Sequence, residues 1–299
     1  MDIRVLKYFL AVAREQSFSQ AANMLYLSQP TLSRQLHELE QELGRQLFVR
    51  GNKGVTLTED GMMLRKRAEE IIELVEKTEE ELKHNSDHIN GTVYIGAGET
   101  YAFKLIADTG KKLQLNYPEV KLSIFSGDGS DVLERLDKGL IDFGVIFQEL
   151  DDTKYESVEI PLHDTWGVLT RRDSPLAEKS EIDFSELAEH PLIIPRQPNH
   201  TTLISKLIEE QTQKKKININ VVSEYNLVYN ASVLVKEGMG SAITLDKLIN
   251  VSGNSEMCFI PLKPLTEAVC RFAWKRYSVF SKAADKFLEM FLEDMKNYK

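Results

Sequence analysis

The segment from Ser28 to Gly44, SQPTLSRQLHELEQELG, constrains the fold more than any other stretch of the chain. Ser28 is a favourable N-cap for a helix, and Pro30 fits the first turn, where no amide hydrogen bond is lost. Gly44 is a residue at which such a helix ends. Leucines recur at the helical spacing that places them on one stripe, at Leu32, Leu36, Leu39 and Leu43. The pattern predicts a helix with one packed face and one polar face.

A second, shorter helix is expected just upstream. Ser19 is expected to cap it, Ala21 and Ala22 lie within it, and only Tyr26 and Leu27 separate its end from Ser28. Two helices joined by so short a turn, with small residues where they cross, form a helix-turn-helix. Downstream, QLFVRGNKGVTL is expected to form two short strands around a glycine turn. This hairpin would be a wing beside the helix-turn-helix.

The polar face of the longer helix and the wing are candidates for DNA contact. A helix in the major groove contacts base edges, and cations of a wing meet phosphates or the minor groove. The alternative is an ordinary amphipathic helix with a solvated polar face, but the tight turn, the alanines and the basic wing together favour DNA. The candidate DNA-binding residues are Gln29, Pro30, Thr31, Ser33, Arg34, His37, Arg50 and Lys53.

Charge is distributed unevenly along the 299 residues. The net charge is −9, yet residues 1–68 hold ten Lys and Arg against seven Asp and Glu, which leaves −12 on the remainder. A mildly basic head on an acidic body is compatible with local DNA binding. It disfavours a non-specific nucleoid protein, because the acidic body repels DNA outside the head.

Composition places the protein among globular cytoplasmic proteins. No apolar run approaches the roughly 20 residues of a membrane span, and the N-terminal segment does not have the pattern of a signal peptide. Cys258 and Cys270 are too far apart for a two-residue redox or zinc spacing, so both are expected to be reduced packing residues. We expect a cytoplasmic protein of two or three domains with no membrane partner.

The stretch FSQAANMLYLSQPTLSRQLHELEQELGRQLFVR, followed by LTEDG, resembles the N-terminal winged helix-turn-helix of LysR-type transcriptional regulators. The resemblance implies a long linker helix, a two-lobed α/β effector domain of periplasmic-binding-protein type, and a homo-oligomer, either a dimer or a tetramer. The expected domains are residues 1–58 for the winged helix-turn-helix, 59–89 for the linker and 90–299 for the effector domain. Within the last, lobe I would span about 92–161 and 268–299, and lobe II about 162–267.

The linker itself has the pattern of a long helix. Thr58 is a suitable N-cap, and Glu59 and Asp60 are favourable in the first turn of a helix. A heptad series predicts a two-stranded coiled coil, and the alternative is a helix that lies on its own body. The series contains Leu64, Ala68, Ile71, Val75, Thr78 and Leu82.

Two patterns that suggest a bound cofactor are weak. His84 and His88 are four residues apart on the expected helix, but no third or fourth metal ligand lies near them in the sequence. In GAGETYA, Tyr101 occupies the position of the third glycine of a dinucleotide-binding fingerprint, where its bulk obstructs close packing. We therefore expect no metal and no cofactor.

The C-terminal body alternates strand and helix patterns. TVYIGAG is expected to be a strand followed by a helix from Glu99 to Asn116, and KLSIFSG, SDVLERLDKG and LIDFGVIF form a strand, helix and strand. PLIIPRQ, INVVSEYN, GSAIT and AVCRFAWKR continue as strands before a last helix from Ser281 to about Lys299. Right-handed crossovers gather the strand ends along one edge of each sheet.

The resemblance implies that loops of both lobes line a cleft for a small-molecule effector. The residues carried over to it are Glu99, Thr100, Ser126, Phe147, Arg196, Thr201, Thr202 and Asn226. Glu99 favours a cationic or hydroxyl-rich effector, whereas Arg196 favours an anion, unless the two side chains pair with each other.

Other functions have less support in the sequence. G-x-S-x-G, H-E-x-x-H and Walker patterns are absent, which disfavours the enzymes that use them. A solute-binding protein would need an export signal and would have no use for the DNA head. The expected function is that of a bacterial sequence-specific transcriptional regulator, not an enzyme, controlled by an effector bound between the lobes. Its expected partners are a dyad-type site in double-stranded DNA, the effector, further copies of itself and, for an activator, RNA polymerase.

Overall fold

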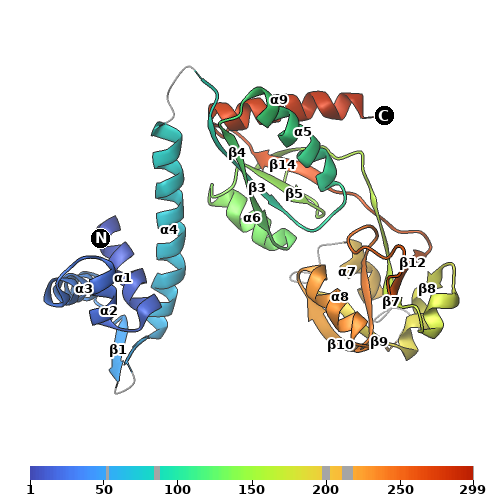
Figure 1. The fold of residues 1–299 in the computed structure, drawn as a ribbon, viewed down its shortest axis with the longest axis horizontal. Coiled ribbons are helices and arrows are strands. Elements are labelled where there is room, and N and C mark those ends of the chain that lie inside the picture. Colours follow the sequence, from blue (N-terminus) through green and yellow to red (C-terminus); the bar gives the residue numbers. More distant parts are fainter. Residues whose placement is uncertain (52–53, 84–87, 197–202, 211–217, 299) are drawn as a thin grey trace. The chain divides into compact units, whose positions relative to one another are not determined.

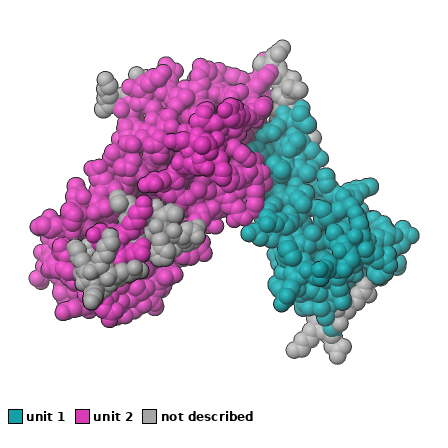
Figure 2. Space-filling view, turned by 180° about the vertical axis from the view of Figure 1, so that it is seen from behind, with its two compact units in different colours: residues 1–85 teal, residues 86–299 magenta. Residues whose placement is uncertain are grey.

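The computed structural model describes residues 1–51, 54–83, 88–196, 203–210 and 218–298. The chain divides into two compact units, Met1–Asn85 and Ser86–Lys299 (Figures 1 and 2). None of the described helices combines the length and the hydropathy that crossing a bilayer requires.

The first unit packs a helix-turn-helix, a hairpin and part of a long helix around one core. Its elements are α1 (Ile3–Glu15), α2 (Phe18–Met24), α3 (Gln29–Leu43), β1 (Phe48–Gly51), β2 (Gly54–Leu57) and α4 (Glu59–Lys83). Strands β1 and β2 pair antiparallel and form the expected wing. Phe9, Phe18 and Phe48 meet in the core, where the rings of Phe9 and Phe48 lie 5.2 Å apart. The apolar sides of α1, α2 and α3 thus share one core with the wing.

The caps of the helix-turn-helix agree with the sequence in α3 and differ in α2. The Ser28 side chain accepts the Thr31 N–H, and Gly44 ends α3 at φ +61°. The N-cap of α2 is Ser17, whose hydroxyl accepts the Gln20 N–H, so the expectation for Ser19 is wrong. Ser19 lies inside the helix, because α2 begins early enough to bury Phe18 in the core.

The leucine stripe of α3 is shorter than expected. Leu32, Leu36 and Leu39 are buried, whereas Leu43 is 39% exposed and lies in the last turn, beyond the core. A contact that the leucine pattern does not indicate anchors the end of α3 instead. The Glu40 carboxylate accepts the N–H groups of Leu47 and Phe48 at 2.7 and 3.2 Å, which fixes the start of the wing.

Helix α4 begins as expected, and its first half packs on the core of its own unit. The Thr58 hydroxyl accepts the Gly61 N–H at 2.9 Å. Ala68 is fully buried in the core of this unit, and Leu64 and Ile71 pack against the same core. Ala68 thus leaves no exposed surface in the single chain, and the seam between two chains stays a prediction. Further along, Leu82 is 68% exposed.

The second unit contains two sheets, which we call lobe I and lobe II (Figure 1). Lobe I is a five-stranded sheet in the order β4-β3-β5-β14-β6. Its strands are β3 (Gly91–Ala97), β4 (Val120–Ser126), β5 (Phe143–Ile146), β6 (Tyr155–Glu159) and β14 (Arg271–Lys275), and its helices are α5 (Phe103–Asn116), α6 (Gly129–Asp137) and α9 (Lys282–Asn297). Helices α5 and α9 cover one face, and α6 packs on the other.

Lobe II is a mixed sheet in the order β10-β9-β11-β7-β12-β8, with β13 paired to β7. The strands are β7 (Asp164–Arg171), β8 (Ile182–Asp183), β9 (Pro191–Pro195), β10 (Asn220–Tyr225), β11 (Ser241–Leu245), β12 (Met257–Lys263) and β13 (Glu267–Ala268). The helices are α7 (Leu203–Glu209), α8 (Val228–Lys236) and two short 3-10 helices, Pro175–Glu178 and Phe184–Glu189. Helix α8 covers one face, and α7 with the two 3-10 helices covers the other.

The chain crosses between the lobes twice, once between β6 and β7 and once between β13 and β14. The Ile160 N–H donates to the Cys270 carbonyl oxygen at 2.9 Å, which ties the two crossings together. Asp164 lies fully buried at the start of β7 and accepts the Thr100 hydroxyl and the Tyr101 N–H. Burial raises the pKa of the Asp164 carboxyl, although the hydrogen bonds from Thr100 and Tyr101 oppose that effect.

Most of the strands expected in this unit are present, and one helix starts later than expected. Helix α5 begins at Phe103 and not at Glu99, because residues 99–102 form a turn held by Asp164. Helix α9 has its N-cap at Ser281, as expected. Cys258 and Cys270 are both free thiols, and burial raises the pKa of the Cys270 thiol well above its ordinary value.

Gly61 provides a test of the packing of α4 on the wing. A Cβ at this position would lie 2.2 Å from the Leu47 carbonyl oxygen, a backbone atom that accepts the Thr58 N–H. Alanine favours a helix over glycine by about 1 kcal/mol, yet overpacking of this kind costs about 1–3 kcal/mol. We expect Gly61→Ala to accelerate hydrogen exchange of the α1–α3 amides in the full chain. The control is Gly51→Ala, whose new Cβ meets only the Gly54 carbonyl oxygen at 3.8 Å. Equal exchange in the two variants would contradict this account.

Candidate functional site

The exposed face of α3 brings together most of the residues predicted to bind DNA. Gln29, Pro30, Thr31, Arg34 and His37 are exposed, while the leucines behind them are buried. Ser33 lies on the same face and is half-buried. The face is therefore available to a ligand without any change in the core of the unit.

Local contacts keep this face ordered. The hydroxyls of Ser28 and Thr31 lie 2.7 Å apart in the first turn of α3. Arg34 approaches the Glu38 carboxylate at 3.8 Å, with 71% of its side chain exposed. An ion pair that exposed is weak, so the guanidinium can exchange Glu38 for a phosphate or a base edge at small cost.

The wing residues of the prediction are only partly described. Arg50 belongs to β1, but its side chain lies outside the described part of the chain, as does the whole of Lys53. The backbone places Arg50 in the hairpin beside the helix-turn-helix, paired with Val55. The hairpin is joined to the end of α1 by the Val55 N–H, which donates to the Gln16 carbonyl oxygen at 2.9 Å.

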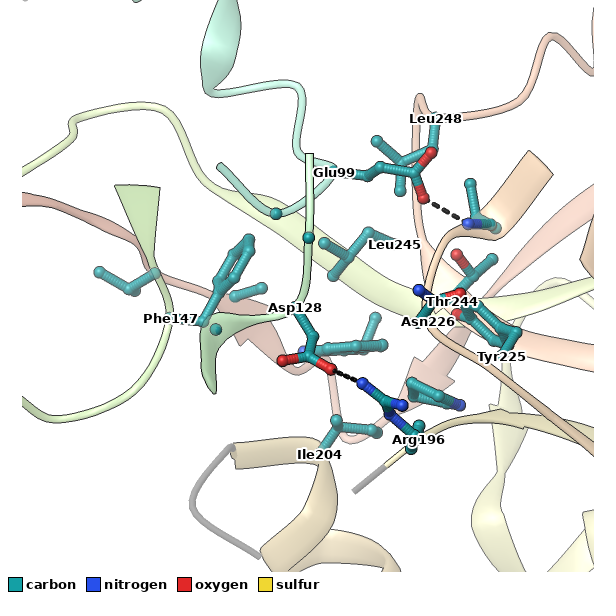
Figure 3. A pocket seen from close by; sticks show the side chains of 18 of the residues that line it. Glu99, Asp128, Phe147, Arg196, Ile204, Tyr225, Asn226, Thr244, Leu245 and Leu248 are labelled. Carbon is teal, nitrogen blue, oxygen red and sulfur yellow. Dashed lines mark hydrogen bonds and ion pairs between the residues drawn. The ribbon is translucent and has the colours of Figure 1, made fainter. Parts of the chain in front are cut away.

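A second candidate site is a cavity of about 290 Å³ between the two lobes (Figure 3). Its size is at the small end of ligand pockets, which span roughly 300–1,000 Å³. Four predicted residues line it: Glu99, Phe147, Arg196 and Asn226. Further lining residues are Gly98, Gly127, Asp128, Gly129, Trp166, Pro195, Ile204, Tyr225, Val228, Thr244, Leu245, Leu248, Glu267, Ala268 and Val269.

Two other predicted effector residues that the structure describes, Thr100 and Ser126, are not among the lining residues. Thr100 is buried, is not among the lining residues, and donates its hydroxyl proton to Asp164. Ser126 is exposed at the end of β4 and is not among the lining residues. Thr201 and Thr202 lie outside the described residues.

The sequence left open whether Glu99 and Arg196 pair with each other, and in the structure they do not. Arg196, at the end of β9, forms an ion pair with Asp128 at the start of α6, across the cavity from one lobe to the other. Glu99, from lobe I, accepts the Val228 N–H at the start of α8 in lobe II. Two carboxylates of lobe I thus bridge to two donors of lobe II.

Asp128 is held from two sides. One oxygen accepts the Ser130 and Asp131 N–H groups at 3.0 and 3.1 Å and caps α6, while the other meets Arg196. Burial by itself would raise the pKa of the Asp128 carboxyl, but the guanidinium and the N–H donors outweigh burial and hold that pKa below its usual value. The carboxylate is therefore charged at neutral pH.

Three further lining residues, Tyr225, Thr244 and Glu267, were not predicted from the sequence. The Tyr225 hydroxyl donates to the Ile243 carbonyl oxygen at 2.7 Å, and Thr244 is 2% exposed beside it. Glu267 contacts His163 at 3.2 Å. Thr244 is the last residue of the predicted strand GSAIT and the next to last of β11, so the strand-end argument applied to GSAIT would have found it. Asp128 lies two residues beyond Ser126, so its position after the end of a strand would also have indicated it.

Two family models match the chain. The model of the LysR substrate binding domain matches residues 86–296, and that of the bacterial regulatory helix-turn-helix protein, lysR family, matches residues 3–62. Together they cover both compact units.

Characterised relatives and solved structures agree with these matches. The transcriptional regulator BsdA of Bacillus subtilis (strain 168) is 29% identical over 306 residues, covering 97% of this chain and 100% of that protein. The regulator BudR of Raoultella terrigena is 26% identical over 297 residues, covering 97% and 100%. The crystal structure of CbnR, a LysR family transcriptional regulator, has a TM-score of 0.77 at 18% identity and 99% coverage of both chains. CbnR complexed with its target DNA has a TM-score of 0.74, with the same identity and coverage. This chain belongs to the LysR family of DNA-binding transcriptional regulators, with an N-terminal helix-turn-helix and a C-terminal substrate-binding domain.

Proposed function

We propose that the protein is a cytoplasmic, sequence-specific regulator that binds a dyad-type promoter site and responds to a small molecule in the cavity between its lobes. The observation that supports DNA recognition is the division of α3 into a buried leucine face and an exposed polar face. Base contacts are assigned to Gln29, Ser33 and Arg34, and backbone contacts to the wing. Retardation of DNA from upstream of its own or a neighbouring operon tests this function directly.

The effector response is proposed to act through the two bridges between the lobes. A ligand changes a conformational equilibrium only if it binds one arrangement better than another. The pairs Asp128–Arg196 and Glu99–Val228 both cross the cavity, so a molecule bound there meets the groups that hold the lobes together. Binding would alter the arrangement of the lobes and, through further copies of the chain, the spacing of the DNA-binding heads.

Self-association is proposed to use the exposed end of α4. Since Ala68 is buried and Leu64 and Ile71 contact the core of their own unit, the remaining seam positions are Val75, Thr78 and Leu82. Leu82 is 68% exposed, so its side chain is available to the corresponding helix of a second copy. For an activator, contact with RNA polymerase is a further expectation.

Arg34→Ala tests base recognition. Loss of a base-edge contact is expected to weaken binding to the specific site by about 1–3 kcal/mol and to relax preference at one position of each half-site, with little effect on random DNA. Fluorescence anisotropy on both DNAs measures this difference. The control is Arg65→Ala, which removes an equal charge from α4, where Arg65 pairs with Glu69 at 3.1 Å. Equal losses on specific and random DNA for Arg34→Ala would refute the assignment.

Leu82→Glu together with Val75→Glu tests the seam. A charge buried between two helices has no partner, so the linker contact is expected to separate and affinity for a palindromic site to fall. Sedimentation velocity gives the assembly state. The control is Met63→Glu, since Met63 is also an exposed apolar residue of α4, at 63%, but lies outside the heptad series. An unchanged assembly in the double variant would show that other surfaces hold the oligomer.

Asp128→Asn tests the ion pair between the lobes. Asparagine caps a helix as well as aspartate, so the change removes the charge and keeps the cap of α6. Because the folded-state pKa is lowered, the stabilisation is present above the unfolded value of about 3.9 and is lost as pH falls through the folded value. We expect Asp128→Asn to be less stable by about 0.2–1 kcal/mol at pH 7. Urea unfolding should show this difference vanish in stronger acid, and a difference that grows on acidification would contradict it.

A further inference from the structure

The lining of the cavity is acidic. Among the described residues it holds three carboxylates, those of Glu99, Asp128 and Glu267, and one cationic side chain, that of Arg196. Lys247 lies between two lining leucines in the sequence but turns to Asp246, at 3.0 Å. An acidic lining attracts cations and repels anions, and the effect is stronger where protein excludes water.

The single arginine of the described lining is already paired within the protein. Arg196 pairs with Asp128, and Asp131 adds a second carboxylate at 3.8 Å. The Asp128 carboxylate that accepts from Arg196 also caps α6 through Ser130 and Asp131. Carboxylates of the protein therefore neutralise the positive charge of Arg196.

The other donor position of the site is also occupied by a carboxylate of the protein. Helix α8 begins after Leu227, which offers no side-chain cap, and Glu99 from lobe I accepts the Val228 N–H in its place. In the part of the chain that the structure describes, Glu99 has no cationic partner. A carboxylate has two oxygens, so one remains for a donor from a ligand.

The rest of the lining fits an organic molecule with a polar group. Phe147 and Trp166 contribute aromatic rings to the lining. Leu245 and Leu248 contribute aliphatic surface (Figure 3). The buried Thr244 hydroxyl lies beside the Tyr225 hydroxyl, whose proton is donated to the Ile243 carbonyl oxygen. Two hydroxyls and an aromatic and aliphatic surface thus lie together in the lining.

We propose that the cavity binds a small organic cation, whose positively charged nitrogen pairs with Glu99 and whose apolar body packs between Phe147, Trp166 and the leucines. Aromatic faces near a cation add to the attraction of the carboxylate. This inference rests on the proposed role of the cavity as the effector site, and it specifies the charge of the effector. The Asp128–Arg196 pair forms a neutral wall of the same site.

Three probes of similar shape and different charge test the proposal on the full chain: 2-phenylethylammonium, 2-phenylethanol and 3-phenylpropanoate, titrated calorimetrically at pH 7. We expect the cation to bind about tenfold tighter than the alcohol, because it gains one charge-assisted hydrogen bond. The anion is expected to bind weakest. Glu99→Gln keeps an oxygen for the Val228 N–H and removes the charge. It should therefore lose this preference while binding of the alcohol is unchanged.

The control variant is Glu181→Gln, a carboxylate of lobe II that pairs with Lys263 and does not line the cavity. Thermal unfolding of each variant verifies folding. Anion binding equal to or tighter than cation binding would overturn the proposed charge class and leave the cavity as an effector site. Failure of all three probes to bind would overturn the proposal as a whole. Retardation of promoter DNA without a probe tests the regulatory function separately, since DNA binding belongs to the other unit.

Discussion

The double crossing between the two lobes is the constraint on which the second unit depends. Two connecting segments join the sheets, and the Ile160 N–H of one donates to the Cys270 carbonyl oxygen of the other. Asp164 joins them to the loop after β3 by accepting from Thr100 and Tyr101. A carboxylate with no exposed surface is tolerated only when hydrogen bonds replace its hydration, and here two donors do so. These hydrogen bonds fix the junction of the two lobes.

The cavity follows from that junction. Because the loops after β3 and β4 end near the crossings, their carboxylates reach lobe II and meet Val228 and Arg196. Each bridge serves two purposes, since Glu99 caps α8 and Asp128 caps α6 while both span the gap. Carboxylates of the protein thus occupy the positions at which an anionic ligand would bind. The described lining is left with a negative charge, which favours a cation.

The first unit divides its surfaces in a similar way. Leu32, Leu36 and Leu39 are used in the core together with Phe9 and Phe48, and the opposite face of α3 stays open. The same core takes in the first half of α4, including the buried Ala68. A heptad pattern cannot distinguish packing within one chain from packing between two chains, because both require the same apolar periodicity. We therefore expect a partner helix only at the exposed end of α4, around Leu82.

Local sequence determined the elements of this protein. Caps at Ser28 and Thr58, the glycine stop at Gly44 and the alternation of strand and helix patterns are short-range effects, and the corresponding elements are present in the structure. The resemblance of the N-terminal segment then supplied the family, which the family models establish.

Tertiary structure decided which polar side chains meet. Glu99, Asp128 and Arg196 are brought together from loops as far apart as 97 residues in the sequence. Whether Arg196 pairs with Glu99 or Asp128, and whether the Thr100 hydroxyl faces a ligand or Asp164, depends on distances of a few ångströms set by the packing of two sheets. Hydrogen bonds and ion pairs fall off over such distances, whereas the periodicity of a helix or strand is fixed by its own backbone. The sequence alone therefore determined the elements and the polar face of α3, and the folded chain decided the chemistry of the cavity.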